Sequence, residues 1–427
     1  MAFDTKYVIG YDLNNEMSQM SFCSLKNPEP ETFSTVAGEQ KYMIPTVLCK
    51  KRDVNQWFFG EEAKKVMTHD EGELVDSLLE KTRAGEELVI DQEEYNPMSL
   101  LVLFMKRTLN MLNTCLSMED VEVLMITVDV LDPVTLDILE TVAEELPIAR
   151  EKIFFQSYAE SIYCYTLHQP VELWKHRVMV FDYAGPYLKS FGLYMNEKTK
   201  PVVAFIDSAT FEDIRLPEKM YPNMEEQARN ERMDDILLQA IRESVDRYTI
   251  SSVYLIGDGF EGDYLKKTLK YLCMGRRVFQ GMNLYTKGAC YSAMEKLVPG
   301  PFSESHIFLG KDKLKFNLGI KVKQAGEEKY AALVDAGVNW YETKEKYDFI
   351  LGGDPIVPLI ITPLDGKDVQ VHEIALTGLP MRPAKATRLS LRISFGSEHL
   401  VRIRINDLGF GEMYPSTGKV WDEEIEI

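Results

Sequence analysis

Two aspartates, Asp12 and Asp182, occupy the same position in two similar stretches of sequence. Each ends an apolar, strand-like run and is followed by a polar turn and a second apolar run, over 7–22 in one case and 177–194 in the other. Backbone N–H groups at such a turn are free to face a phosphate or a metal, and carboxylates bind hard cations. The plainer interpretation is a pair of ordinary hairpins, in which each aspartate supports its turn by a side-chain hydrogen bond.

Alternating strands and helices must position the first aspartate. After the first hairpin, the hydrophobic patterns indicate strands at 44–49 and 56–59, helices at 60–67, 70–83 and 95–116, a strand at 121–130, a helix at 134–145, a strand at 152–156 and a helix at 157–167. The run 121–130 is apolar throughout, which is typical of a parallel strand that is covered on both faces. This order of elements predicts an α/β lobe.

The same pattern restarts around the second aspartate. Strands are predicted at 178–194, 202–209, 252–256 and 277–280, and helices at 223–248, 263–272 and 287–297. Both halves open with a hairpin and close with βα units. We therefore expect two lobes that arose by structural duplication, although they do not repeat each other's sequence.

The character of the sequence changes after Leu297. Residues 299–305 are typical of a linker, and from about residue 307 apolar and polar residues alternate with period two. The runs Arg388–Phe395 and 400–406 flank a short turn, as in a hairpin. The pattern predicts a separate antiparallel β domain of ordinary single-domain size.

Composition narrows the class of protein. The 427 residues carry a net charge of −19, which argues against nucleic acid or an anionic membrane surface as a general partner. No apolar run approaches the roughly 20 residues that span a bilayer, and the first residues do not have the pattern of a signal peptide. The six cysteines and six histidines are scattered, which favours a reduced, cytoplasmic protein without a structural zinc site.

Short motifs follow one another in order along nearly the whole chain. They are Gly10-Tyr11-Asp12-Leu13-Asn14-Asn15-Glu16, Gly60-Glu61-Glu62-Ala63-Lys64, Phe181-Asp182-Tyr183-Ala184-Gly185-Pro186-Tyr187, Leu255-Ile256-Gly257-Asp258-Gly259, Lys287-Gly288-Ala289-Cys290, Phe316-Asn317-Leu318-Gly319-Ile320, Leu376-Thr377-Gly378-Leu379-Pro380 and Thr417-Gly418-Lys419. Their order resembles that of the seventy-kilodalton heat-shock chaperones of the actin-like ATPase superfamily. The first and third motifs are similar to the two phosphate loops of that family, the fourth to its adenosine loop, and the last three to its β domain.

This resemblance implies a fold and a domain organisation. The implied fold is an α/β two-lobed, actin-like ATPase domain with ribonuclease H-like lobes, followed by an all-β sandwich of the peptide-binding type. Lobe I would span 1–170, and lobe II, with a reduced upper subdomain, 171–305. A linker with the first β strand would span 306–322, and the sandwich 323–427. The helical lid of the family is not expected in a chain that stops at Ile427.

The resemblance also implies ligands. ATP or ADP with Mg²⁺ would be the cofactors, and Asp12 and Asp182 would serve the catalysis by holding the magnesium through water. The residues carried over as nucleotide-binding are Gly10, Asn14, Asn15, Gly185, Gly257, Asp258 and Gly259. A protein or peptide partner would bind the β-sandwich, at residues that the sequence does not identify.

Several positions depart from the family pattern in a way that weakens this chemistry. Phosphate loops need glycine, because a side chain blocks the approach of the anion to the backbone N–H groups. Here Asn14 and Asn15 replace Gly-Thr, Glu16 adds a negative charge, and Pro186 removes an N–H donor. Leu78 lies closest to the catalytic lysine of the family, with Lys81 as a conceivable substitute.

The coupled Asn-Glu-Pro motif of the family is replaced by Gln156-Ser157-Tyr158, which loses the glutamate. From these departures we expect a diverged, chaperone-like protein with weak or lost nucleotide binding and hydrolysis. Two alternatives stay open: a working magnesium-dependent ATPase, and a small-molecule kinase of the same superfamily that uses Asp129 as general base. Arg392, Arg402 and Arg404 could face an acidic partner, or could simply be solvated.

Overall fold

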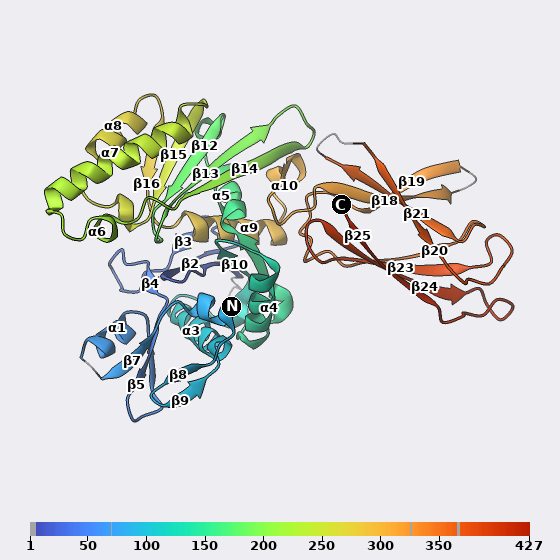
Figure 1. Ribbon diagram of the computed structural model, residues 1–427, viewed down its shortest axis with the longest axis horizontal. Coiled ribbons are helices and arrows are strands. Elements are labelled where there is room, and N and C mark those ends of the chain that lie inside the picture. The colour runs from blue at the N-terminus through green and yellow to red at the C-terminus, as the bar shows by residue number, and fades with distance from the viewer. Residues whose placement is uncertain (1–5, 70, 325–326, 365–367) are drawn as a thin grey trace. The chain divides into compact units, whose positions relative to one another are not determined.

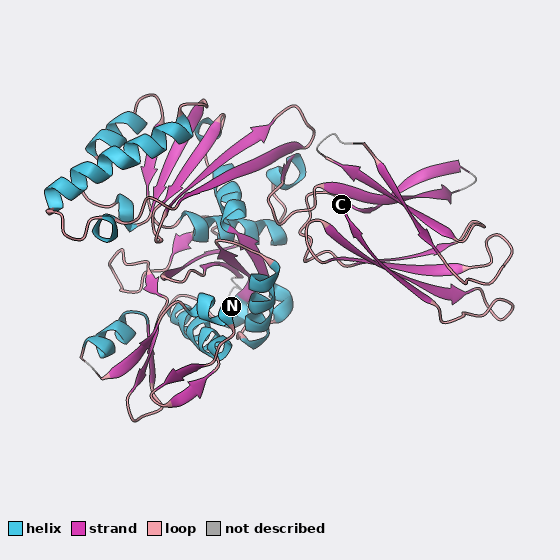
Figure 2. Cartoon of the chain, in the orientation of Figure 1, coloured by secondary structure: helices cyan, strands magenta, loops and turns pink. Residues whose placement is uncertain are grey.

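A computed structural model of the chain describes residues 6–69, 71–324, 327–364 and 368–427. The chain divides into two compact units, Met1–Ile307 and Phe308–Ile427 (Figure 1). Helices occur almost entirely in the first unit, and the second consists of strands and loops (Figure 2). Among the described residues, no helix is long and apolar enough to cross a membrane.

The first unit contains two six-stranded sheets with the same internal order. The first sheet runs β11-β10-β1-β2-β3, with β4 paired to β2, and its strands are β1 (Tyr7–Asp12), β2 (Met17–Ser24), β3 (Glu31–Thr32), β4 (Ile44–Pro45), β10 (Val121–Val128) and β11 (Ile153–Ser157). The second runs β16-β15-β12-β13-β14-β17, and its strands are β12 (Arg177–Asp182), β13 (Leu188–Asn196), β14 (Val202–Phe211), β15 (Ile250–Ile256), β16 (Arg277–Gln280) and β17 (His306–Phe308).

These sheets repeat each other in pairing as well as in order. In the first, β1 is antiparallel to β2 and parallel to β10, and in the second, β12 is antiparallel to β13 and parallel to β15. Strands β1 and β12 also share a register irregularity after their first residue, between Tyr7 and Val8 in one and between Arg177 and Val178 in the other. The two halves of the unit are therefore structural repeats of one βββαβαβα plan.

Helices α5 (Tyr158–Leu167) and α9 (Leu284–Leu297) close the two repeats and pack against each other between the two sheets (Figure 1). Helix α9 follows β16 of the second sheet in sequence but packs on β1 and β10 of the first. A glycine permits the close crossing, since a Cβ atom on Gly288 would lie 2.0 Å from the carbonyl oxygen of Ser161. This crossing ties the two repeats together.

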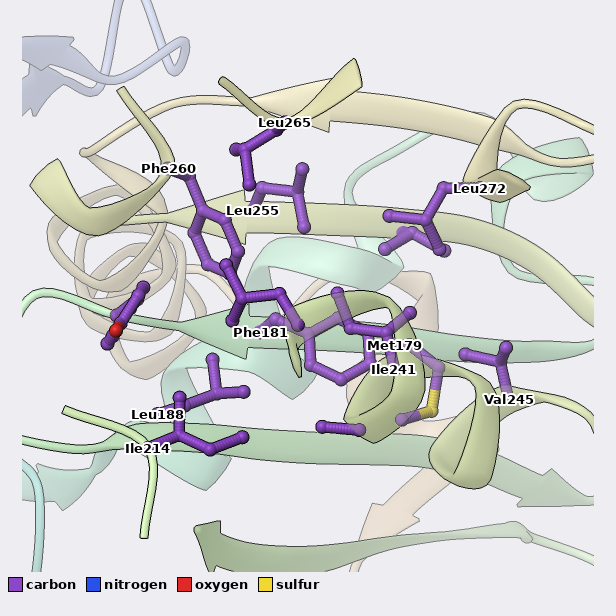
Figure 3. Close-up of a cluster of buried hydrophobic side chains, with 14 of the residues drawn as sticks. Met179, Phe181, Leu188, Ile214, Ile241, Val245, Leu255, Phe260, Leu265 and Leu272 are labelled. Carbon is purple, nitrogen blue, oxygen red and sulfur yellow. The ribbon is translucent and has the colours of Figure 1, made fainter. Parts of the chain in front are cut away.

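The remaining helices of the first unit cover the sheets. They are α1 (Gly60–Thr68), α2 (Leu78–Ala84), α3 (Pro97–Met111), α4 (Pro133–Glu145), α6 (Pro217–Met220), α7 (Glu226–Val245), α8 (Lys266–Leu272) and α10 (Pro301–Ser305). Helix α7 lays Met233, Leu237 and Ile241 on the second sheet, where they form one buried cluster with Phe181 and Leu255 (Figure 3). The apolar period of this stretch predicts such a helix, and the structure begins it three residues later than expected.

The segment 70–83 differs from the helix that its acidic, helical period predicts. Gly72–Val75 is strand β7, which joins β5 (Leu48–Lys51) and β6 (Trp57–Phe59) in a small sheet, and the helix begins only at Leu78. Gly72 lies against β5, where a Cβ atom would approach the Cys49 sulfur to 2.5 Å. Pairing with a distant strand thus overrides the local helical pattern. Strands β8 (Leu88–Ile90) and β9 (Glu93–Tyr95) form a separate hairpin.

The residues expected as a linker are ordered. Within 299–305, α10 carries Phe302, whose ring contacts those of His168 and Trp174 in the first unit. Strand β17 follows at once and is the edge strand beside β14. Aromatic packing and strand pairing therefore fix a stretch whose proline and serine content is typical of a linker.

The second unit consists of two antiparallel four-stranded sheets. Their orders are β19-β18-β21-β22 and β20-β23-β24-β25, and the strands are β18 (Phe316–Gln324), β19 (Glu327–Val334), β20 (Glu345–Ile350), β21 (Ile356–Pro363), β22 (Gln370–Ala375), β23 (Arg388–Phe395), β24 (Leu400–Gly409) and β25 (Val420–Glu426). Alternate residues such as Leu389, Leu391 and Ile393 are buried. Phe316 of one sheet meets Phe395 of the other, with ring centroids 6.3 Å apart, so the two sheets share a core.

Candidate functional site

The two aspartates singled out in the sequence occupy equivalent places in the two repeats. Asp12 is the last residue of β1, and Asp182 is the last residue of β12. Both are buried, with exposed fractions of 7% and 6%. The apolar strands that they end carry both carboxyl groups into the region where α5 and α9 begin, so each carboxyl group needs a buried partner.

Asp12 finds its partner in Tyr158, the first residue of α5. The tyrosine hydroxyl donates to Oδ1 of Asp12 over 2.6 Å, and it accepts a hydrogen bond from Nδ2 of Asn14 over 3.2 Å. Burial raises the pKa of Asp12 to about 8, against the lowering effect of the Tyr158 hydrogen bond, and the nearby Asp182 and Asp129 raise it further. At neutral pH this carboxyl group is therefore mostly protonated.

Asp182 is held in the same way by Tyr285, the second residue of α9. The Tyr285 hydroxyl donates to Oδ2 of Asp182 over 2.8 Å, and the backbone N–H of Ala184 donates to Oδ1 over 3.0 Å. Burial raises the pKa of Asp182, while these two hydrogen bonds and the charge of Lys189 lower it. Both oxygens of this carboxyl group are thus occupied by the protein.

The two tyrosines lie directly on each other. The rings of Tyr158 and Tyr285 are stacked, with centroids 3.7 Å apart and planes within 10° of parallel. Asp12, Tyr158, Tyr285 and Asp182 therefore form one continuous chain of side chains from the first sheet to the second, which we call the tyrosine bridge. Burial, followed by the nearby carboxyl groups, raises the pKa of both phenols, so both stay protonated and remain hydrogen-bond donors.

An ion pair lies close to this bridge. Lys189 of β13 donates through Nζ to Oδ2 of Asp129, which follows β10. Asp129 is the residue that a kinase would need as general base, and here it is partly exposed and paired with a cation. The charge of Lys189 also reaches Asp182, whose pKa it lowers. The position of Lys189 indicates that it neutralises the carboxyl groups of Asp129 and Asp182. An Asp129 paired in this way is poorly placed to abstract a proton.

The asparagines of the first predicted phosphate loop support the local backbone. Oδ1 of Asn15 accepts the backbone N–H of Glu80 over 3.0 Å, in the first turn of α2. Oδ1 of Asn14 accepts the N–H of Glu16 over 3.0 Å, and its amide nitrogen faces Tyr158. Each asparagine side chain thus has a structural partner.

Most of the glycines carried over as nucleotide-binding residues lie at close backbone crossings. Gly10 is inside β1, where a Cβ atom would lie 2.2 Å from the carbonyl oxygen of Thr286 in α9. Gly257 has a φ of +99°, and a Cβ atom there would lie 2.3 Å from the nitrogen of Ala184. At Gly259 it would meet the ring of Tyr183 at 2.2 Å. The segment Asp258–Phe260 therefore packs on the turn after Asp182.

Other predicted positions are free of such contacts. A Cβ atom on Gly185 would have no neighbour within 4 Å, and Asp258 is exposed. Leu78, at the position nearest to the catalytic lysine of the family, is fully buried. Lys81 of α2 donates to Asp76, which precedes that helix, over 2.8 Å.

The donor set around Asp12 and Asp182 does not fit a hydrated magnesium ion. Such an ion needs ionised carboxylate oxygens that are free to accept from its water shell. Here burial raises the pKa of Asp12 to about 8, and protein donors already bind three of the four carboxyl oxygens of the two aspartates. In the described part of the chain, no group of three or more His, Cys, Asp or Glu residues is placed to hold a metal ion.

The tyrosine bridge is the part of this site that the sequence did not reveal. Tyr158 belongs to the stretch Gln156-Ser157-Tyr158, which stands out in the sequence only because it lacks the glutamate of the family's Asn-Glu-Pro motif. Tyr285 lies just before the predicted helix 287–297 and gives no signal of its own. Their equivalent positions at the starts of α5 and α9 become visible only once the repeats are aligned by strand order.

Comparison with known proteins gives two family matches. A model described as "Family of unknown function (DUF5716) C-terminal" matches residues 29–311, which is about two thirds of the chain. A second, described as "Domain of unknown function (DUF8552)", matches residues 313–427. The boundary between the two matches lies close to the division between the two compact units. No curated protein matches the chain.

Proposed function

We propose that this chain, which belongs to the family of unknown function DUF5716 (C-terminal), is a diverged relative of the seventy-kilodalton heat-shock chaperones. In this proposal, its first unit is an actin-like, two-lobed domain in which nucleotide binding is weak or lost. Its second unit is a β-sandwich that binds a protein or peptide partner in the cytoplasm. The protein would act as a binding module, with weak or absent ATPase activity.

The tyrosine bridge is the observation that carries this proposal. In an ATPase of this type, two aspartates at the ends of matching strands hold magnesium between the lobes. Here two phenols satisfy the corresponding carboxyl groups and stack on each other, so the two halves are joined by protein side chains alone. A ligand that needed both carboxylates would first have to break two buried hydrogen bonds, each worth about 1 kcal/mol or more.

The second unit supports the binding part of the proposal. Two antiparallel sheets with exposed edge strands offer backbone groups with which an extended peptide can pair. Large apolar side chains on its loops, including Met381, Phe410 and Met413, are exposed to solvent. Large exposed apolar residues that lie together commonly mark a protein-binding surface, and Phe410 and Met413 line the same hollow.

One observation favours a working ATPase as the second candidate. Asp12 and Asp182 lie at equivalent positions of the two repeats, where a pair of magnesium-holding carboxylates would be required. For this candidate, the tyrosines would have to move when nucleotide binds. The kinase is supported less, because Asp129 is paired with Lys189.

Calorimetry with magnesium-ATP separates the two candidates. The wild-type chain, Asp12→Ala and Asp182→Ala are titrated in parallel, and their melting curves are recorded with and without millimolar nucleotide. We expect no saturable heat and no melting shift for any of them. A saturable signal in the wild type that both alanine variants lack would show that the two aspartates still hold magnesium-nucleotide, which would overturn the loss of binding and favour the ATPase candidate.

A client assay tests the binding part separately. We expect the chain to suppress aggregation of a heat-denatured model enzyme, equally well with and without magnesium-ATP. A chain that neither binds nucleotide nor delays aggregation would contradict the chaperone-like function. Phosphoryl transfer to a small hydroxyl compound that disappears in Asp129→Asn would favour the kinase instead.

A further inference from the structure

The outer face of the sheet β20-β23-β24-β25 carries a row of opposed cations. Lys346, Arg392 and Arg404 stand directly opposite one another on three neighbouring strands. Like charges opposed across strands destabilise a sheet. Of the three, Arg404 alone makes an ion pair among the described residues, with Asp422 of β25 over 2.6 Å, while Asp348 lies on the same face of β20, opposite Ser390. The row therefore carries positive charge in excess of what the sheet neutralises.

Further cations extend this row along β23. Arg388 lies on the same face as Arg392, four residues earlier, and Lys385 precedes it in the adjoining loop. Lys385, Arg388 and Arg392 are all exposed. Within the described residues, the side chains of these three and of Lys346 make no hydrogen bond or ion pair. The chain has a net charge of −19, and a net charge far from zero helps to keep a protein soluble. Cations gathered on one face reduce the magnitude of this charge, so a need for solubility does not explain them.

Two hollows are lined in part by these cations. One, of about 520 Å³, is lined by Arg392, Arg402 and Arg404 together with Asp422 and Glu424. The other, of about 680 Å³, is lined by Phe410, Met413 and Tyr414 beside Lys385 and Arg388. Met413 is 83% exposed and Phe410 47% exposed. The second hollow thus combines apolar side chains with two unpaired cations, and Glu412 is the acidic residue in its lining.

The loops that form the second hollow are held in place by a buried ion pair. Arg382 donates to both oxygens of Asp407, each over 2.9 Å, and to the carbonyl of Pro415 over 2.8 Å. Asp407 also accepts from the backbone N–H groups of Gly409 and Thr417. The segments on both sides of the hollow are therefore fixed before any ligand binds, which lowers the entropic cost of binding.

We propose that this face binds an extended acidic polypeptide segment, with carboxylates on Arg388 and Arg392 and a bulky apolar side chain in the hollow beside Met413. The proposal rests on the proposed function, because it names the class of partner that the second unit binds. A β-strand rises about 3.3 Å per residue, so the two arginines are about 13 Å apart, a distance that acidic residues four apart in an extended peptide would match.

The sheet itself shows which anion its arginines accept. Asp422 and Glu424 of β25, two residues apart, pair with Arg404 and Arg402. Alternating carboxylates on a strand are thus already bound by half of the arginines on this face. The apolar side chains of the second hollow give a phosphate nothing to contact, but they can pack against a bulky apolar side chain of a peptide. A carboxylate-bearing peptide is accordingly favoured over nucleic acid.

Fluorescence anisotropy on the full chain tests the proposal. The probe is a short fluorescein-labelled peptide with two glutamates four residues apart and a leucine two residues beyond them, so that all three side chains share one face when it is extended. The same peptide with lysine in place of glutamate is the charge-reversed control. We expect saturable binding of the acidic peptide alone, which weakens as salt is raised, because exposed charges are screened. Arg388→Gln combined with Arg392→Gln should weaken binding by about tenfold or more, since each arginine gives up a charge-assisted hydrogen bond.

Matched variants identify the face. Lys321→Gln combined with Lys329→Gln removes the same charge from the other sheet and should leave the affinity unchanged. Met413→Ser should weaken binding several-fold if the hollow accepts leucine. Equal loss in both double variants would reduce the effect to net charge and overturn the proposal. Stronger binding of a single-stranded oligonucleotide, or of anionic vesicles, than of the acidic peptide would also overturn it.

Failure of this inference can be told apart from failure of the proposed function. If the chain delays aggregation of a denatured enzyme and Arg388→Gln with Arg392→Gln delays it equally, the binding function stands and the basic face is not its site. If the acidic peptide binds to this face but the chain protects no denatured enzyme, the site stands and the chaperone-like function fails.

Discussion

Tyr158 and Tyr285 stack on each other while each donates its hydroxyl to a different buried aspartate, Asp12 for the first and Asp182 for the second. The four side chains come from the two sheets and the two helices of an internal repeat, so the arrangement is close to symmetric. This symmetry places the joint between the halves on protein atoms. A nucleotide is not needed to hold them together.

Replacing Tyr158 by Phe tests the energetic weight of the bridge. The ring and its stacking remain, but Asp12 and Asn14 each lose a buried hydrogen-bond partner. We expect the free energy of unfolding to fall by about 1–3 kcal/mol, as measured by urea denaturation. The control is Tyr248→Phe, an exposed tyrosine on which Arg177 stacks, which should change stability by less than about 0.5 kcal/mol. Equal losses of stability in the two variants would show that the hydroxyl of Tyr158 contributes no more to stability than that of an exposed tyrosine.

The raised pKa of Asp12 predicts how stability changes with pH. The folded protein holds this proton with a pKa of about 8, and the unfolded chain releases it near pH 4. The folded state therefore binds more protons between these values, and stability falls as pH rises toward 8, by at most about 1.4 kcal/mol per pH unit.

Urea denaturation at about pH 6 and about pH 8 measures this slope. Asp12→Asn, which cannot ionise, should flatten it, although the raised pKa of Asp182 contributes in the same direction. Asp76→Asn, at an exposed aspartate on the same lobe, should leave the slope unchanged. A wild-type chain that gains stability between these two pH values would contradict the buried, protonated state of Asp12.

Two glycines distinguish packing from ligand binding. Gly257→Ala puts a Cβ atom 2.3 Å from the backbone of Ala184 at a positive φ, so we expect a loss of about 3 kcal/mol or more without any nucleotide present. Gly185→Ala faces open space and should be nearly neutral. Thermal melting of both variants compares them. A Gly257→Ala variant as stable as the wild type would return this position to the list of ligand-binding candidates.

The buried ion pair of the second unit should be costly to break. Arg382 and Asp407 have exposed side-chain fractions of 5% and 0%, and Arg382→Met leaves the carboxylate without its cation. We expect a loss of about 3–5 kcal/mol. Arg402→Met breaks an exposed pair with Glu424 and should cost less than about 1 kcal/mol. Denaturation followed through a probe in the second unit compares the two variants. Similar losses of stability would show that water replaces Arg382 as the partner of the Asp407 carboxylate.

Some of this protein follows from local sequence. Apolar strands ending at Asp12 and Asp182, the two-lobed alternation of strands and helices, and the period-two alternation after residue 307 are all patterns of neighbouring residues, and the strands that they predict are present. The helical period at 70–83 misled because Gly72–Val75 gains more from pairing with β5 than from a helical turn.

The tertiary structure alone decided the chemistry of the site. Whether Asp12 is a magnesium ligand or a protonated, capped carboxyl group depends on which side chain meets it, and Tyr158 meets it from far along the chain. That meeting depends in turn on the close crossing of α5 and α9 at Gly288, which no local pattern specifies. Burial and hydrogen-bond partners are properties of segments brought together by folding. The sequence alone therefore determined where the aspartates end their strands, and the packing of two helices determined how deeply they are buried and which side chains they bind.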